Sequence, residues 1–184
     1  MPVWGWIIII AVVAIAIVAL IARQISASRR SSHLRDRFGP EYDRVAGATG
    51  SKRDAESQLE EREERRDQLG IRSLPEASRD RYREWWRTVQ AQFVDDPRGA
   101  IRAADDLIQA VMAERGYPVE DFEQRAADLS VDHPDLVQNY RKGHHLAEAS
   151  RDNGVSTEDL RQAMTHYKAL FVVLMEPESA GSRA

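Results

Sequence analysis

The side chains best suited to chemistry are histidines and aspartates in the second half of the chain. They are His133, His144, His145 and His166, with Asp132 and Asp135 on either side of the first. Imidazole and carboxylate groups bind zinc, iron or manganese, and they also act as general acids and bases. If these side chains converged in the fold, they would form a metal site or a catalytic site.

Their spacing favours structural roles instead. His144 and His145 are adjacent, so on a helix they point about 100° apart and rarely share one ion. Asp132 and His133 precede a helix, where an aspartate can accept hydrogen bonds from backbone N–H groups. His144 and His166 flank apolar stripes. We therefore predict no catalytic residue, no metal and no cofactor, with His133, His144 and His166 as the remaining candidates for a metal site.

The familiar catalytic motifs are missing from the sequence. It has no phosphate-binding glycine loop, no GxSxG nucleophile motif, no HExxH zinc motif and no cysteine. An enzyme with a cryptic His/Asp site in the helical domain therefore stays only as an alternative hypothesis.

The element that places all of these residues is the apolar segment 4–22, which reads WGWIIIIAVVAIAIVALIA without a charged side chain. A helix of this length spans about 28 Å, close to the hydrocarbon core of a bilayer. No basic residue precedes it and no good cleavage site follows, which argues against a signal peptide. The segment predicts an uncleaved transmembrane helix, with Trp4 and Trp6 at the membrane interface.

Basic residues lie on one side of this segment only. Residues 1–3 carry none, whereas five arginines lie between residues 23 and 37, with Asp36 the only acidic residue among them. The positive-inside rule predicts residues 1–3 outside the cell and the remaining chain in the cytoplasm, anchored in the cell (inner) membrane by a single pass. We expect Arg23, Arg29 and Arg30 to lie at the membrane interface.

Charge is distributed unevenly along the chain, whose formal net charge is −4. Residues 23–93 carry 16 basic and 13 acidic side chains, and residues 94–184 carry 10 and 17. Anionic headgroups would attract the first part and repel the second. The acidic second part argues against nucleic acid as a partner.

Residues 23–72 are predicted to be a basic juxtamembrane segment, broken at Gly39-Pro40, followed by a charged helical spacer. Within the spacer, residues 51–69 have strong helix propensity but only a thin apolar stripe. A solvated helix is the simpler interpretation. A coiled-coil stalk is the alternative, although Arg62 and Arg66 fall where its seam should be apolar.

Residues 73–176 predict a soluble bundle of about five helices, and the chain as a whole is predicted to be all-α. Apolar stripes recur at helical spacing, and no sustained strand-like alternation occurs. We expect Pro118 to start a short helix and Gly143 to interrupt a later one. Residues 177–184 are predicted to be a disordered tail.

The adjacent tryptophans Trp85 and Trp86 end up about 100° apart on a helix, so one can enter the core while the other stays at its rim. Tryptophan is enriched in protein-binding anchors. Core packing is the simpler interpretation, and the pair is also our candidate for partner binding.

The run FVDDPRGAIRAADDLIQAVMAERGYPVEDFEQRAADLSVDHPDLVQNYRKGHH, with RFGPEYDR before it and STEDLRQAMTHYKALF after it, resembles a family of uncharacterised bacterial single-pass membrane proteins. The resemblance extends from about Leu34 to Phe171. It implies a membrane topology with a cytoplasmic helical domain, and it implies no activity.

These observations favour a membrane-anchored interaction or scaffold module of unknown biochemical activity. Its partners would be the lipid bilayer and another protein or a second copy of the chain. A structural envelope protein is the second hypothesis, and an enzyme or metal-binding protein is the third.

Overall fold

The computed structural model describes the backbone of residues 3–152 and 154–177 and the side chains of residues 14–26, 28–151 and 154–177. Within these ranges the chain is helical and contains no strand, which confirms the predicted all-α class. It divides into two compact units, Met1–Glu56 and Ser57–Ala184. The predicted tail after residue 177 lies outside the described residues.

The first unit is built from α1 (Val3–Phe38), α2 (Pro40–Thr49) and the first residues of α3 (Lys52–Gln68). Gly39 adopts a φ of 46°, which favours glycine, and Pro40 opens the next helix. The predicted break at Gly39-Pro40 is therefore confirmed. Side chains from all three helices are buried, namely Leu34, Phe38, Tyr42, Val45 and Ala55.

Within the described residues, no helix is both long enough and apolar enough to cross a membrane. The side chains of residues 1–13 lie outside the described part of the chain, and with them Trp4, Trp6 and the first ten residues of the predicted transmembrane segment 4–22.

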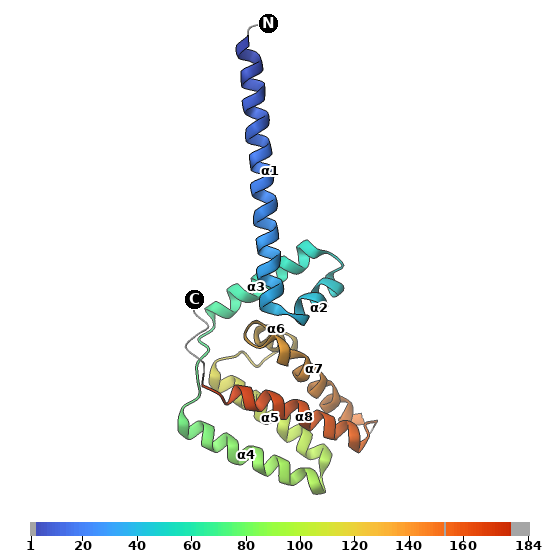
Figure 1. Ribbon diagram of the computed structural model, residues 1–184. Coiled ribbons are helices and arrows are strands. Elements are labelled where there is room, and N and C mark those ends of the chain that lie inside the picture. The colour runs from blue at the N-terminus through green and yellow to red at the C-terminus, as the bar shows by residue number, and fades with distance from the viewer. Residues whose placement is uncertain (1–2, 153, 178–184) are drawn as a thin grey trace. The chain divides into compact units, whose positions relative to one another are not determined.

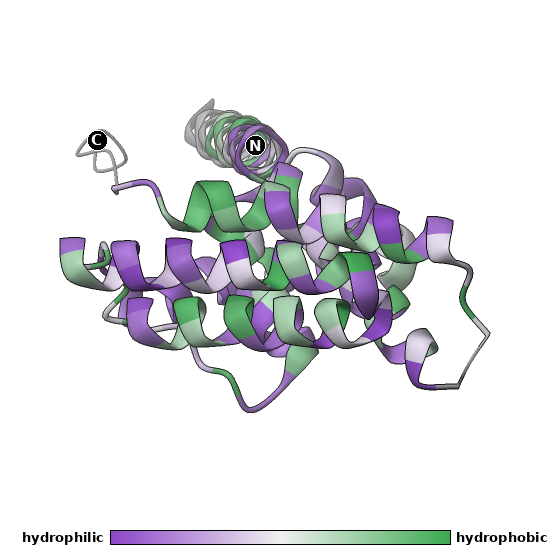
Figure 2. Cartoon of the chain, turned by 90° about the horizontal axis from the view of Figure 1, so that it is seen from below, coloured by the Kyte–Doolittle hydropathy of each residue, from purple (hydrophilic) through white to green (hydrophobic). Residues whose placement is uncertain are grey.

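The second unit is a helical bundle, as predicted for residues 73–176. Its helices are α4 (Glu76–Asp95), α5 (Pro97–Arg115), α6 (Phe122–Asp132), α7 (Pro134–Ala149) and α8 (Thr157–Leu174), with a short 3-10 turn, η1 (Ser150–Asp152), after α7. Helix α5 packs against α4, α7 and α8, and α7 also packs against α6 and α8 (Figure 1). The helices carry both hydrophilic and hydrophobic residues along their length, as amphipathic helices do (Figure 2).

Side-chain caps start three of these helices. Asp96 accepts a hydrogen bond from the backbone N–H of Gly99 at 2.9 Å, and Asp121 accepts one from that of Gln124 at 2.7 Å. Ser156 and Asp159 form a reciprocal capping box at the start of α8. These local signals fix where the helices begin, and α5 ends at Gly116, whose φ is 101°.

Gly143 does not interrupt its helix, contrary to our expectation, because α7 continues to Ala149. Its role is close packing. A Cβ at this position would lie 3.3 Å from the Tyr167 ring, which is fully buried on α8. The absence of a side chain therefore lets α7 approach this ring, and that contact offsets the low helix propensity of glycine.

The charged spacer is helical, as predicted, but it is not solvated on every side. From Ser57 onward α3 belongs to the second unit, and Leu59 and Arg62 are buried. Arg66 Nε lies 2.8 Å from both carboxylate oxygens of Asp132 on α6. Arg62 donates to the Ser130 hydroxyl at 3.3 Å. Polar contacts thus help to attach this segment to the bundle.

Candidate functional site

The candidate histidines are separated in the fold. His133 occupies the N-cap position of α7 without a side-chain capping bond, and His145 is exposed. His166 Nδ1 lies 3.1 Å from the Asn139 side-chain oxygen, and burial followed by the charge of Lys142 lowers its pKa. Among the described residues, no three histidine, aspartate or glutamate side chains are arranged to hold a metal ion.

Asp132 and Asp135 do not join the histidines. Asp135 is exposed. Asp132 was expected to cap a helix, but its carboxylate instead accepts hydrogen bonds from Arg66 at 2.8 Å and from the Tyr117 hydroxyl at 3.1 Å. Burial and the neighbouring Asp132 charge raise the pKa of the Tyr117 phenol. Asp132 therefore links α3, α6 and the loop before α6.

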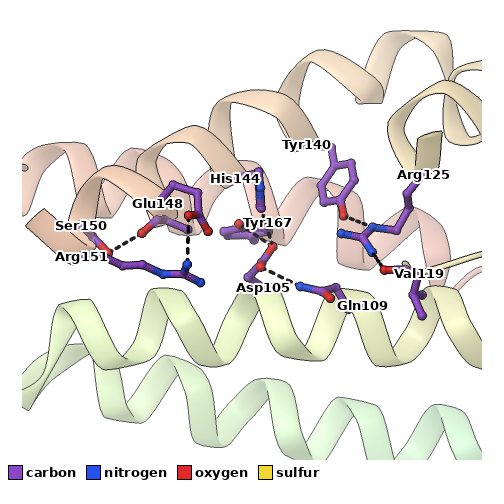
Figure 3. Close-up of polar contacts among 11 residues, drawn as sticks. Asp105, Gln109, Val119, Arg125, Tyr140, His144, Glu148, Ser150, Arg151 and Tyr167 are labelled. Carbon is purple, nitrogen blue, oxygen red and sulfur yellow. Dashed lines mark hydrogen bonds and ion pairs between the residues drawn. The ribbon is translucent and has the colours of Figure 1, made fainter. Parts of the chain in front are cut away.

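His144 lies close to a buried carboxylate. Its Nδ1 lies 3.5 Å from Oδ1 of Asp105 on α5, a distance typical of a loose ion pair when the imidazole is protonated (Figure 3). The imidazole ring stacks on Phe122, with ring centroids 3.7 Å apart and an interplanar angle of 13°. Three helices, α5, α6 and α7, hold this pair in place.

Asp105 is the centre of the network and was not among the residues predicted from the sequence. The hydroxyl of Tyr167 donates to Oδ1 at 2.9 Å, and the side-chain amide of Gln109 donates to Oδ2 at 2.8 Å. Burial raises the pKa of the Asp105 carboxyl, but the interactions with His144 and Tyr167 outweigh burial and hold the pKa below its usual range. Burial and the Asp105 charge raise the pKa of Tyr167, so its phenol stays protonated.

A second buried contact lies beside this network. The Arg125 Nε group donates to the Tyr140 hydroxyl at 2.6 Å, and another guanidinium nitrogen donates to the backbone carbonyl of Val119 (Figure 3). Arg125 is only 3% exposed, and its guanidinium carbon lies 5.9 Å from the ring centroids of both Phe122 and Tyr140. Arg125 thereby fastens the segment before α6 to α7.

The network favours stability over catalysis. A catalytic His–Asp pair needs an imidazole nitrogen within hydrogen-bond reach of a bound substrate. Here Tyr167, Gln109 and His144 approach the Asp105 carboxylate, and the imidazole lies flat on Phe122. A buried carboxylate with these partners joins helices and specifies how they pack.

The two tryptophans have different environments, as their adjacency predicted. Trp86 is 6% exposed and stacks on Phe171 of α8, with ring centroids 4.9 Å apart and an interplanar angle of 13°. Trp85 is 38% exposed and stacks on Tyr82, with centroids 6.3 Å apart. Of the two, Trp85 is accessible to a partner.

In the first unit, two of the three predicted interface arginines line an open groove. Arg23 and Arg30 on α1 belong to its lining, and Arg29 does not. The groove has a volume of about 1090 Å³, and residues at the start of α3 form its other side.

The chain matches no protein-family model, no curated protein and no solved structure. The resemblance to uncharacterised single-pass membrane proteins therefore remains a prediction, and the function has to be argued from this chain's own residues.

Proposed function

We propose that this protein is a membrane-anchored helical interaction module. Segment 4–22 anchors the chain in the cell membrane, and α4–α8 form a bundle that binds another protein or a second copy of the chain on the cytoplasmic side. The uncharacterised single-pass family that the sequence resembles would share this arrangement.

The observation that carries the proposal is the composition of α1. This single helix of 36 residues has the nineteen uncharged residues of segment 4–22 in its first part and five arginines in its last sixteen positions. In a bilayer, a lone span has to be helical because its backbone finds no other hydrogen-bond partners. The arginines then favour a cytoplasmic location for the part of the helix that follows.

The second support is the mixed surface of α4. Trp85 and Val94 expose 38% and 81% of their surface on this helix, while Trp86 and Val89 are buried. Tryptophan is enriched among the residues that dominate binding energies at interfaces. We take the exposed side of Trp85 as the point of contact with a protein partner.

The anchor can be tested by extraction and topology reporters in a bacterial host. We expect the full chain to stay in the membrane pellet after alkaline carbonate washing, because the apolar segment is buried in lipid. A green fluorescent protein fused at the C-terminus should fluoresce, and an alkaline phosphatase fused there should be inactive. Release by carbonate would contradict the anchor, and an active phosphatase would contradict the orientation.

Site-specific photo-crosslinking tests the interaction surface. We expect a benzophenone amino acid at position 85 of the full chain to give one discrete adduct in intact cells. The same group at Arg83 serves as the control, because Arg83 is exposed on another side of α4 and pairs with Asp80 at 2.8 Å. Adducts of equal yield at both positions, or none at position 85, would contradict a partner surface at Trp85.

A further inference from the structure

The groove in the first unit is strongly basic. Five of its lining residues are basic and one is acidic, namely Arg23, Arg30, Arg35, Lys52, Arg53 and Glu56. Four serines, at positions 26, 28, 31 and 32, also line it, and those at 26, 28 and 32 supply hydroxyl groups, since Ser31 donates to Glu56. Basic side chains and hydroxyl donors are the groups that proteins use to bind phosphate oxygens.

The single acidic residue is already satisfied by its own neighbours. Glu56 is 8% exposed, and its Oε1 accepts hydrogen bonds from Ser31 at 2.5 Å and from the Tyr42 hydroxyl at 3.0 Å. The ammonium of Lys52 lies 3.7 Å from the same oxygen. Burial raises the pKa of Glu56, but these contacts outweigh it and lower the pKa, so the carboxylate is ionised and holds α3 against α1. Arg23 and Arg53 are exposed in the same groove and carry its positive charge.

The lining of the groove changes from apolar to basic along α1. Its apolar lining residue is Leu20, inside the apolar segment, and Arg23 follows one turn later. At about 1.5 Å per residue, Arg30 lies roughly 10 Å further along the helix than Arg23. An apolar end followed by a basic, hydroxyl-rich end matches a phospholipid, whose acyl chains join a phosphorylated headgroup. A free phosphate would need only the basic end.

We propose that this groove binds the phosphorylated headgroup of an anionic phospholipid. The inference rests on the proposed anchor, because segment 4–22 in a bilayer places Arg23 at the level of the headgroups. Juxtamembrane basic residues gain affinity for anionic lipid in this way. The groove adds a defined site, in which α1 and α3 contribute arginines to the same headgroup.

The test uses the full chain solubilised in a neutral detergent, so that binding does not depend on insertion into a bilayer. The probes are short-chain phosphatidylglycerol, short-chain phosphatidylcholine and inorganic phosphate, and the dissociation constant of each is measured by calorimetry. We expect phosphatidylglycerol to bind more tightly than phosphatidylcholine. Inorganic phosphate should bind more weakly than phosphatidylglycerol, because it makes no contact near Leu20.

Three variants that each lose one positive charge distinguish binding in the groove from attraction by the general surface charge. Arg53→Gln and Arg30→Gln should each weaken phosphatidylglycerol binding about fivefold, the loss expected for one basic residue near an anionic headgroup. Arg29→Gln is the matched control, since Arg29 is exposed on α1 beside Arg30 but does not line the groove. It should change the affinity less than twofold, and circular dichroism should show that all three variants keep their helices.

Three outcomes would overturn the proposal. Equal affinity for the two lipids would show that the groove does not select an anionic headgroup. An equal loss for Arg29→Gln and Arg53→Gln would show diffuse surface attraction. Phosphate binding as tightly as phosphatidylglycerol would identify a free-phosphate site. The carbonate extraction tests the membrane anchor separately. A wrong anchor would therefore appear as release from the membrane pellet, and a wrong groove would appear in the dissociation constants.

Discussion

Replacing Trp86 with alanine is expected to lower the free energy of unfolding of the bundle by about 3–5 kcal/mol, the usual cost of removing a buried aromatic side chain. The Trp86 ring is 6% exposed and lies almost parallel to Phe171, so it fills the space between α4 and α8. Its loss leaves a cavity that the stacked ring of Phe171 cannot close. Guanidinium unfolding of the full chain in mild detergent, followed by far-ultraviolet circular dichroism, measures the effect.

Trp85→Ala is the matched control for this prediction. Trp85 is the neighbouring residue of the same type, but it is 38% exposed and stacks on Tyr82. Its replacement should cost about 1 kcal/mol or less, as for other partly exposed positions. Similar losses for both variants would contradict the packing of α4 described above. The Trp85→Ala chain should also remain folded, so a loss of protein-partner binding by this variant would not result from unfolding.

The sequence predicted that one tryptophan of the pair is buried and could not say which. Adjacent residues of a helix differ by about 100°, and an apolar stripe defines the buried direction only to about that precision. Trp86 is the buried one of the pair, and it stacks on Phe171, which lies 85 residues further along the chain. Such a contact has no local signal.

Helix ends were predictable where a local cap decides them. Asp96 and Gly116 lie at the two ends of α5, and both are local signals, because a side-chain N-cap and a positive φ need no distant partner. The expectation that Pro118 starts a helix was wrong, since α6 begins at Phe122 behind the Asp121 cap. The Arg125 guanidinium binds the Val119 carbonyl and holds this segment outside the helix.

The central carboxylate did have a signal in the sequence. Asp105 lies in line with Ile101, Ile108 and Met112, at the spacing of one helix face, so an aspartate sits in the middle of an apolar stripe. A charged residue at such a place has to be paired when it is buried. Its partners Tyr167 and His144 come from other helices, and only the fold identifies them.

The attachment of α3 could not be predicted from its own residues. The charged side chains of Arg62 and Arg66 argued against the apolar seam of a coiled coil. In the fold, both side chains donate hydrogen bonds to polar groups. The partners Ser130 and Asp132 lie 68 and 66 residues further along the chain. Helix propensity and charge spacing depend on residues a few positions apart, so they predicted the helix but not its contacts with α6.

Removing the Asp105 carboxylate is expected to have the second large effect on stability. Asp105→Ala leaves the Tyr167 hydroxyl and the Gln109 amide without their acceptor, and it removes the carboxylate that lies 3.5 Å from His144 Nδ1 (Figure 3). Buried polar groups that lose a charged partner cost about 2–4 kcal/mol. Asp106→Ala is the control, because Asp106 is the next residue on α5, has the same charge and is exposed. It should change stability by less than about 0.5 kcal/mol.

The pH dependence of Asp105→Asn separates the charge from the shape of this side chain. The pKa of Asp105 is lower in the folded chain than in the unfolded chain, despite its burial. The folded state therefore gains stability from the ionised carboxylate above about pH 4 and loses it as the pH falls through the folded pKa. Asp105→Asn lacks this contribution at every pH. Its unfolding free energy should be lower than that of the wild type at pH 7, and the difference between the two should begin to shrink as the pH falls below about 4. Parallel curves from pH 7 to pH 3 would contradict an ionised Asp105 as the centre of the network.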